Sequence, residues 1–179
     1  MKKKLSLSEL KKLHDKEYVD KYHKEDKFRI NRLMKFVRLN KEDIILDIGC
    51  GNGLLVDYVK DYVDEYYGGD FSEDFIKEAV KRNKIDNKVK FFCGDVIKFC
   101  ENSKIKFDKV FALDFTEHIY NDDFIKIFSA VHNSMKEGGE LYIHTPNGDY
   151  ILEILKDKGI MKQFPEHIEV RNASEYVNL

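Results

Sequence analysis

The sequence predicts an α/β fold of three layers, in which helices cover both faces of a parallel sheet. Two observations predict it. Short apolar runs alternate along the chain with stretches whose apolar residues recur at helical spacing, the pattern of repeated strand–helix units. The first run, Ile44–Ile48, is almost wholly apolar, as expected for a strand buried on both faces, and it leads directly into a glycine-rich turn. With 179 residues and 42% apolar content, we expect one domain.

The first 40 residues are expected to form a helical cap on the sheet. Residues 7–39 are predicted to be helical, with a break between residues 14 and 27. The apolar positions expected to pack on the sheet are Phe28, Ile30, Leu33, Phe36, Val37 and Leu39.

The turn after the first strand separates two classes of cofactor. Its glycines are Gly49, Gly51 and Gly53, which let the turn tighten and let backbone amides approach a ligand. Dinucleotide-binding folds use G-x-G-x-x-G or G-x-G-x-x-A, whereas here the third glycine comes one residue early and Leu54 occupies the diagnostic position. The spacing therefore favours S-adenosylmethionine over NAD. Residues 54–63 are predicted to form the next helix.

The second and third predicted strands each end in an acid. Asp70 ends the second and lies about 20 residues beyond the glycine turn, the distance at which a carboxylate accepts the ribose hydroxyls of a nucleoside. Ser72 is then expected to cap the following helix. The third strand, residues 89–93, is followed by Asp95 and Val96.

The fourth and fifth predicted strands place polar residues at the same edge of the sheet. Residues 107–113 form the fourth strand, and Asp114, Glu117 and His118 follow it as D-x-x-E-H. A helix is predicted from residue 121 or 122 to the glycines at 138 and 139. Residues 140–144 then form the fifth strand, which ends at His144, with Asn147 beyond. Contact with an acceptor and a structural role are both open for these two residues.

These segments, from residue 44 to residue 147, resemble in order the motifs of class I S-adenosylmethionine-dependent methyltransferases of the ubiquinone-type, methyltransferase-11-like group. The resemblance implies a Rossmann-like sheet with strand order 3-2-1-4-5. It also implies that Asp47 and the turn support the methionine end, Asp70 the ribose and Asp95 the adenine. A lid at Tyr18, Tyr22 and His23 is a further expectation. The cofactor-binding residues expected are Arg29, Asp47, Gly49, Cys50, Gly51, Asp70, Phe71, Asp95, Val96 and Leu113.

The D-x-x-E-H segment is similar to the E-x-x-E-H stretch that binds magnesium in ubiquinone-type O-methyltransferases and small-RNA 2′-O-methyltransferases. The resemblance makes Asp114, Glu117 and His118 candidate ligands for Mg²⁺, although Asp replaces the first Glu. Glu117 and His118 are also the candidate catalytic residues, because a neutral imidazole can accept a proton near neutral pH. Many relatives with only E-H bind no metal, so both interpretations stay open. By the same resemblance, His167 is a candidate to approach this site.

The C-terminal residues 148–179 are predicted to be mostly helical, with a turn at residues 164–168 and a helix opening at Ser174. The resemblance implies two further strands after the fifth, and we expect these to be missing, as in a shortened chain. The domain is thus predicted to consist of a cap (1–40), a cofactor-binding core (41–147) and this helical segment (148–179). An exposed edge on the fifth strand invites pairing, so a homodimer through that edge is a possible partner arrangement.

Composition excludes several functional classes. The net charge of −2 and a pI near 6.3 give no nucleic-acid footprint. No run approaches about 18 apolar residues, so no membrane span is expected. Three cysteines without C-x-x-C spacing, in or beside predicted buried strands, indicate reduced structural thiols and favour a cytoplasmic protein.

The expected function is methyl transfer from S-adenosylmethionine to an oxygen or nitrogen of a small soluble acceptor, with Mg²⁺ as a possible second cofactor. Three alternatives stay open. The first alternative is an inactive S-adenosylmethionine-binding subunit that needs a partner or the missing strands. The second is a metal-dependent RNA 2′-O-methyltransferase. The third is an NAD-dependent enzyme, against which the glycine spacing argues.

Overall fold

The structure is a computed structural model that describes residues 5, 9, 13, 27–83 and 86–179. The expected lid residues Tyr18, Tyr22 and His23 lie outside these described residues. The strands are β1 (Ile44–Ile48), β2 (Glu65–Asp70), β3 (Val89–Cys93), β4 (Phe107–Leu113) and β5 (Met135–His144). The helices are α3 (Lys27–Leu33), α4 (Val56–Val59), α5 (Glu73–Arg82), α6 (Val96–Asn102), α7 (Asn121–Ser134), α8 (Ile151–Asp157) and α9 (Ala173–Val177), with 3-10 turns η1 (Lys60–Tyr62) and η2 (Thr116–His118).

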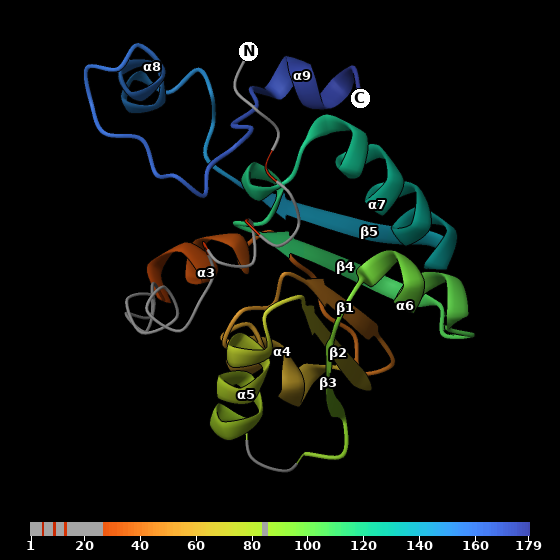
Figure 1. Cartoon of the computed structure of the whole chain (residues 1–179). Helices are drawn as coiled ribbons and strands as arrows, with labels where there is room; N and C mark the ends of the chain where they lie inside the picture. The colour runs from red at the N-terminus through yellow and green to blue at the C-terminus, as the bar shows by residue number, and fades with distance from the viewer. Residues whose placement is uncertain (1–4, 6–8, 10–12, 14–26, 84–85) are drawn as a thin grey trace.

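The five strands form one sheet in the order β3-β2-β1-β4-β5, and every neighbouring pair is parallel (Figure 1). The predicted fold class and strand order are therefore confirmed. The chain winds from β1 outward to β3 and then returns to β4 on the other side of β1. Strand order thus reverses between β1 and β4, and in open α/β sheets ligands bind in the crevice beyond that point.

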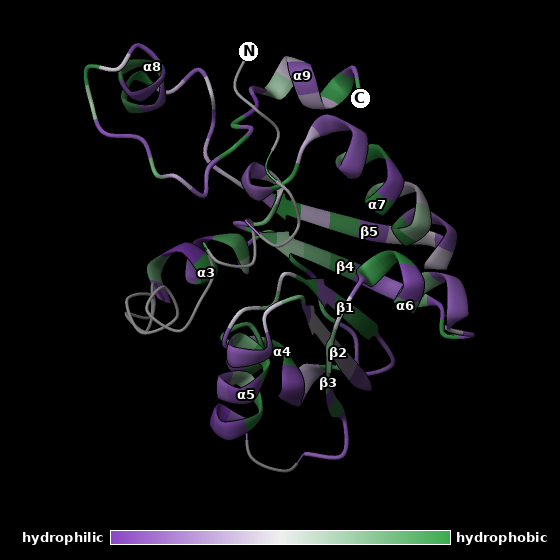
Figure 2. Ribbon diagram, in the orientation of Figure 1, coloured by the Kyte–Doolittle hydropathy of each residue, from purple (hydrophilic) through white to green (hydrophobic). Residues whose placement is uncertain are grey.

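Apolar residues on both faces of the sheet build the core. In β1, Leu46 and Ile48 face one way and Ile45 faces the other, as the two-residue period of a strand requires. The first face packs against α6 and α7, and the second packs against α4 and the segment around α3. Helices α5 and α7 carry both polar and apolar residues (Figure 2), as expected for helices with one side on the sheet. Each fully buried Ile, Leu or Phe contributes about 1.5–3 kcal/mol.

The predicted cap of α5 is confirmed. The Ser72 hydroxyl accepts a hydrogen bond from the backbone N–H of Phe75 at 3.5 Å, and Glu73 and Asp74 occupy the first turn. Acids in this position are stabilised by the helix dipole. The cap fixes where the helix begins and so fixes the loop that leaves β2 beside the sheet edge.

The predicted end of the helix after β4, at Gly138 and Gly139, is wrong. Helix α7 ends at Ser134, and Met135 is already extended and pairs with Phe107 of β4. The Ser134 hydroxyl donates to the carbonyl oxygen of Val131 at 2.7 Å, a local bond that competes with continuation of the helix. The glycines instead lie inside β5, close to a register shift in its pairing with β4.

The N-terminal cap is shorter than predicted in its described part. Helix α3 ends at Leu33, and Phe28 and Phe36 are 69% and 79% exposed rather than packed on the sheet. Phe28 is two positions from Ile30, which places the two side chains on nearly opposite sides of a helix. The residues that do pack on the core from this segment are Ile30, Leu33, Met34, Val37 and Leu39.

The C-terminal segment is less helical than predicted. Helices α8 and α9 are separated by residues 158–172, which contain no helix. This stretch returns to the exit of β4, where the backbone N–H groups of Ile168 and Glu169 donate to the Glu117 carbonyl oxygen at 2.9 and 3.1 Å. The expected turn is present, because the His167 N–H donates to the Phe164 carbonyl at 3.1 Å.

No strand follows β5 in residues 145–179, so β3 and β5 are the outer strands of the sheet as described. Leu141 of β5 is 40% exposed. Among the described residues, the helices are all too short or too polar to cross a membrane.

Candidate active site

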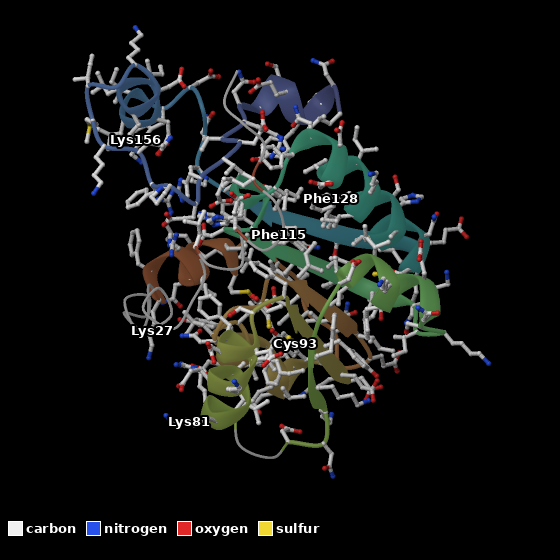
Figure 3. The ribbon with its side chains drawn as sticks, viewed as in Figure 1. Lys27, Lys81, Cys93, Phe115, Phe128 and Lys156 are labelled. Atoms are coloured by element: carbon white, nitrogen blue, oxygen red, sulfur yellow. The ribbon has the colours of Figure 1, made fainter. Side chains whose placement is uncertain are left out.

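A pocket of about 1070 Å³ lies beyond the carboxyl ends of the strands. Residues after all five strands line it, together with α3 and the C-terminal segment. Figure 3 labels two of its wall residues, Phe115 after β4 and Cys93 at the end of β3. Every residue predicted as a cofactor, catalytic or metal-binding residue lines this pocket: Arg29, Asp47, Gly49, Cys50, Gly51, Asp70, Phe71, Asp95, Val96, Leu113, Asp114, Glu117 and His118.

The glycine turn is held tightly against β2 and β4. Gly49 has φ +71°, and a Cβ atom at this position would lie 2.6 Å from Cδ2 of Phe115. The backbone N–H groups of Gly49 and Cys50 donate to the Gly69 carbonyl oxygen at 2.8 and 3.1 Å. Both the backbone conformation and the close approach require glycine here.

Asp70 reaches from the end of β2 to the glycine turn. Its Oδ2 accepts from the Gly51 N–H at 3.1 Å, and its Oδ1 accepts from the Ser72 N–H at 2.8 Å. The residue is 8% exposed. Two backbone donors therefore fix the orientation of this carboxylate in the pocket wall.

Asp47 lies beneath the turn and is 3% exposed. Its Oδ2 accepts a hydrogen bond from the Tyr66 hydroxyl at 2.6 Å. The pKa of Asp47 is raised to about 7, chiefly by burial and to a smaller extent by the nearby Asp70, while the Tyr66 hydrogen bond opposes the rise. The pocket therefore contains a carboxyl group that changes charge near neutral pH.

We expect this group to make stability depend on pH. An unfolded Asp ionises near pH 3.8. Between about pH 4 and 7, the folded chain therefore holds a proton that the unfolded chain has released, and the free energy of unfolding falls by on the order of a few kcal/mol as pH rises through this range. Asp47→Asn should reduce that fall when urea unfolding is measured at several pH values. Asp122→Asn, which removes an exposed charge, is the matched control, and an unchanged slope in Asp47→Asn would contradict the assignment.

The exit of β3 forms the third part of the pocket. Asp95 is exposed, and its Oδ1 accepts from the Ile97 N–H at 2.9 Å, so its side chain caps α6 as well as lining the pocket with Val96. Cys93, the last residue of the outer strand β3, is exposed and lines the pocket. Cys50 and Cys100 are buried, and none of the three cysteines forms a disulfide within the described part of the chain.

Asp114 follows β4 and makes two ionic contacts. Its Oδ2 lies 2.7 Å from Nη1 of Arg29, and its Oδ1 lies 2.9 Å from Nδ1 of His144. Arg29, expected to bind the cofactor, therefore contacts Asp114 in this structure. Asp114, predicted as a metal ligand, directs both oxygens to other side chains.

Glu117 is buried in turn η2, with 1% of its surface exposed. The pKa of its carboxyl is raised to about 7, chiefly by burial and to a smaller extent by Asp114. A bond from the Thr145 hydroxyl to Oε2, at 3.0 Å, acts in the opposite direction. The structure thus gives Glu117 the desolvated, titratable character typical of functional carboxylates.

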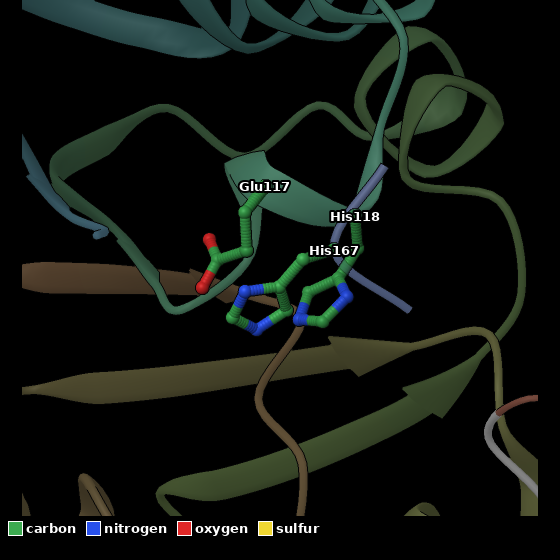
Figure 4. Close-up of side chains that lie close together, drawn as sticks. All are labelled: Glu117, His118 and His167. Atoms are coloured by element: carbon green, nitrogen blue, oxygen red, sulfur yellow. The ribbon is translucent and has the colours of Figure 1, made fainter. Parts of the chain in front are cut away.

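Glu117 and His118 lie beside His167, which comes from the C-terminal segment (Figure 4). One ligand atom from each of the three residues lies within 4.8 Å of the other two. Nδ1 of His118 lies 2.9 Å from the Glu166 carbonyl oxygen, which makes Nδ1 the protonated nitrogen and leaves the lone pair on Nε2. Burial lowers the pKa of His167. The structure therefore groups His167, rather than Asp114, with the other two predicted ligands.

Arg171 ties the C-terminal segment to turn η2. It is 2% exposed, and its guanidinium donates to the carbonyl oxygens of Thr116 at 2.6 Å, Ile119 at 2.8 Å and Glu169 at 3.2 Å. Nε donates to Oδ1 of Asn121 at 2.8 Å. One side chain thereby satisfies carbonyls at both ends of η2 and fixes the turn that carries the polar cluster.

Three residues that contribute to the site were not predicted from the sequence: Tyr66, Thr145 and Arg171. Tyr66 is a strand residue that pairs with Ile45 in the sheet register, and its hydroxyl reaches Asp47, two residues further along β1. Arg171 lies 55 residues from its partner Thr116, in a stretch without a motif. Thr145 directly follows β5, and this position at the carboxyl end of a strand is the one sequence feature that could have identified any of the three.

Comparisons with known proteins agree with this geometry. The chain aligns over 98% of its length, and 88% of the other chain, with the DhpI–SAM–HEP complex at 15% identity and a TM-score of 0.72. It aligns with a SAM-dependent methyltransferase from Archaeoglobus fulgidus over 92% and 72% of the two chains, at 22% identity and a TM-score of 0.71. A putative methyltransferase in complex with the Haloferax volcanii activator Trm112 aligns over 95% and 73%, at 13% identity and a TM-score of 0.71.

At these identities the structural likeness shows the fold alone. A search of curated protein sequences gave no significant match. A family model described as "Methyltransferase domain" matches residues 45–139, which is more than half of the chain and spans the sheet from β1 into β5. The chain therefore belongs to the class I S-adenosylmethionine-dependent methyltransferases.

Proposed function

We propose that this enzyme transfers the methyl group of S-adenosylmethionine to an oxygen or nitrogen atom of a small acceptor, and that it works as a single domain. One observation carries the proposal. A single pocket is lined at the exits of β1, β2 and β3 by the predicted cofactor residues, and at the exits of β4 and β5 by carboxylates and histidines. Two reactants bound there lie side by side, and holding reactants in line accounts for much of the catalysis in such transfers.

The cofactor is proposed to lie along the exits of β1 to β3. Asp70 is already oriented by two backbone donors and has the chemistry to accept the ribose hydroxyls. Asp47 and the glycine turn lie toward β4, where the methionine end and its sulfonium would be next to the acceptor. Asp95 and Val96 lie on the far side, where the adenine ring would fit.

The acceptor is proposed to lie against η2, with Glu117 and His118 facing it. Glu117 is buried and His118 is half-buried, so this end of the pocket excludes much of the water around the reacting atoms. His118→Ala is expected to leave affinity for S-adenosylhomocysteine unchanged and to slow methyl transfer at least about 10²-fold. The measurement is transfer from labelled S-adenosylmethionine, with His132→Gln on the exposed side of α7 as the control. A transfer rate in His118→Ala equal to that of the parent would show that His118 takes no part in methyl transfer.

A divalent cation fits the same cluster. Nδ1 of His167 is buried and has no hydrogen-bond partner among the described residues, a state that a bound ion would relieve. The donors are two imidazoles and one carboxylate, from His118, His167 and Glu117. This set suits a transition metal such as Mn²⁺ or Fe²⁺ better than Mg²⁺, which prefers oxygen ligands. A cation held there would supply a positive charge that orients acceptor oxygens.

Calorimetric titration with Mn²⁺ and with Mg²⁺ tests this site. We expect Mn²⁺ to bind more tightly than Mg²⁺, and His167→Ala to lower Mn²⁺ affinity about 10-fold or more, because one of three protein ligands is lost. His132→Gln is again the control. Equal Mn²⁺ binding by the parent and His167→Ala would remove the cation from the proposal.

The function itself is tested by two linked assays. S-adenosylhomocysteine should bind the purified chain, and labelled S-adenosylmethionine should label members of a panel of small alcohols, phenols and amines. Cofactor binding without labelling of any acceptor, followed by activity when a second protein is added, would instead favour a subunit that needs a partner.

A homodimer through the edge of β5 is part of the proposal, and the mass of the protein in solution tests it.

A role in RNA methylation has weaker support. The chain carries a net charge of −2, whereas proteins that hold RNA carry basic surfaces. Tight RNA binding that weakens steeply with added salt would reverse this preference.

A further inference from the structure

Asp114 and His144 are joined at the exits of the neighbouring strands β4 and β5. His144 pairs with Leu113 in the sheet register, and the Asp114 N–H donates to the His144 carbonyl oxygen at 2.7 Å. Their side chains also meet, with Nδ1 of His144 at 2.9 Å from Oδ1 of Asp114. The two residues are thus held together through backbone and side chains, on rigid elements at the mouth of the pocket.

Asp114 adopts an unusual backbone conformation. Its φ of +51° makes it the one non-glycine residue with positive φ in the described part of the chain. Such a conformation is disfavoured for a residue with a Cβ atom and persists where surrounding contacts enforce it. Here the backbone bond to His144 enforces it, and Nη1 of Arg29 holds the second carboxylate oxygen at 2.7 Å. In this conformation Oδ1 of Asp114 contacts the His144 imidazole, and Oδ2 contacts Arg29 of α3.

The contact fixes the tautomer of His144. A carboxylate oxygen opposite Nδ1 requires the proton to be on Nδ1, which leaves the lone pair on Nε2. The ring is half-buried and lines the pocket with Glu117 and His118. The Asp114 hydrogen bond raises the pKa of His144, against the effects of burial and of Arg29, and Glu117 adds a smaller rise. His118, by contrast, directs Nδ1 to a neutral backbone carbonyl.

We propose that Asp114 and His144 form a base dyad and that the acceptor is therefore a hydroxyl compound, an alcohol or a phenol. This inference rests on the proposed methyl transfer. In this proposal His144, rather than His118, is the base that takes the acceptor proton, and Asp114 is the positioning residue that sets the His144 tautomer and stabilises the imidazolium. The arrangement of carboxylate, imidazole and reacting hydroxyl is the one that activates oxygen nucleophiles in other enzymes.

The step balances without any further reactant. The acceptor oxygen attacks the methyl carbon of S-adenosylmethionine, and its O–H proton passes to Nε2 of His144. The bond between methyl carbon and sulfur breaks, and its electron pair stays on sulfur. The products are a methyl ether, S-adenosylhomocysteine, whose sulfur is neutral, and a His144 imidazolium beside Asp114. The imidazolium then loses its proton to water. A carboxylate acceptor would need no such base, and a neutral amine attacks before it loses a proton.

The tautomer of His144 is measured first, since it needs no acceptor. Two-bond ¹H–¹⁵N spectra of the chain labelled with ¹⁵N-histidine report which nitrogen carries the proton, and loss of signals in His144→Gln assigns them. We expect neutral His144 to be protonated at Nδ1, and Asp114→Asn to shift its titration to lower pH. Protonation at Nε2 in the parent, or an unchanged titration in Asp114→Asn, would overturn the dyad.

Methyl transfer to matched compounds then tests the acceptor class. The panel pairs phenol with aniline and aliphatic alcohols with the corresponding amines, and includes benzoate. We expect labelling of the hydroxyl members, with kcat lowered about 10²- to 10⁴-fold in His144→Gln while KM and the Kd for S-adenosylhomocysteine stay unchanged. Asp114→Asn should lower kcat less, and His132→Gln should not change it. Thermal unfolding shows whether each variant is folded.

The outcomes separate the two proposals. Labelling of amines or benzoate alone, or an undiminished kcat in His144→Gln, would overturn the dyad while leaving methyl transfer in place. Failure of the parent chain to bind S-adenosylhomocysteine would instead overturn the proposed function. If no panel member is labelled, the tautomer measurement alone decides for or against the dyad.

Discussion

Replacing Arg171 with methionine is expected to lower the free energy of unfolding by about 3–5 kcal/mol, among the largest effects of any single change in this chain. Methionine fills similar space but donates no hydrogen bond. The carbonyl oxygens of Thr116, Ile119 and Glu169 would lose their guanidinium donors in a site where Arg171 itself is 2% exposed. The guanidinium also lies 5.2 Å from the ring centre of Phe124, a cation–π contact that would be lost.

Urea unfolding followed by circular dichroism measures this effect. Arg171→Lys keeps the charge but cannot reach carbonyls at both ends of η2, so it should lie between the parent and Arg171→Met. Arg38→Met removes an exposed arginine and is the matched control. A loss below about 1 kcal/mol in Arg171→Met would show that the C-terminal segment is not anchored in this way.

Replacing Asp70 with alanine is expected to weaken binding of S-adenosylhomocysteine about 100-fold or more. Two charge-assisted hydrogen bonds to ribose hydroxyls would each contribute about 1.5–3 kcal/mol, and both would be lost. The substitution also removes the acceptor of the Gly51 and Ser72 N–H groups, so the glycine turn loses a support. Asp70→Asn keeps one oxygen acceptor and should show a smaller loss.

A cofactor analogue separates ribose binding from support of the turn. S-adenosylhomocysteine without its 2′ hydroxyl should bind the parent more weakly, whereas Asp70→Ala should bind both forms alike, as in a double-mutant cycle. Asp74→Asn, on the first turn of α5, is the control for loss of one acid nearby. Equal discrimination against the analogue by the parent and by Asp70→Ala would place the ribose elsewhere.

Local patterns in the sequence were enough to predict the sheet. The apolar run of β1, the glycines that follow it and the capping residue Ser72 each act through neighbours a few residues away. The strand order came through the resemblance that those motifs carry, and the structure confirms it. The boundary between α7 and β5 was missed because pairing of Met135 with Phe107 overrides the local preference to continue the helix to Gly138.

The partners of the polar residues depended on long-range contacts that no local pattern encodes. His118 meets Glu166 across 48 residues, and the whole of residues 158–172 must fold back for that contact to form. The ion pair between Arg29 and Asp114 likewise joins two segments that the sequence assigned to different ligands. Residue types and strand ends therefore located the pocket, whereas the assignment of each side chain within it required the three-dimensional arrangement.

Calorimetric titration of the purified full chain with S-adenosylhomocysteine tests the central claim most directly. The pocket at the carboxyl ends of the strands predicts one binding site per chain with a Kd of about micromolar order, or roughly −8 kcal/mol. Circular dichroism on the same sample establishes that the chain is folded. A folded chain that releases no heat and shows no binding would contradict the assignment of this pocket to S-adenosylmethionine.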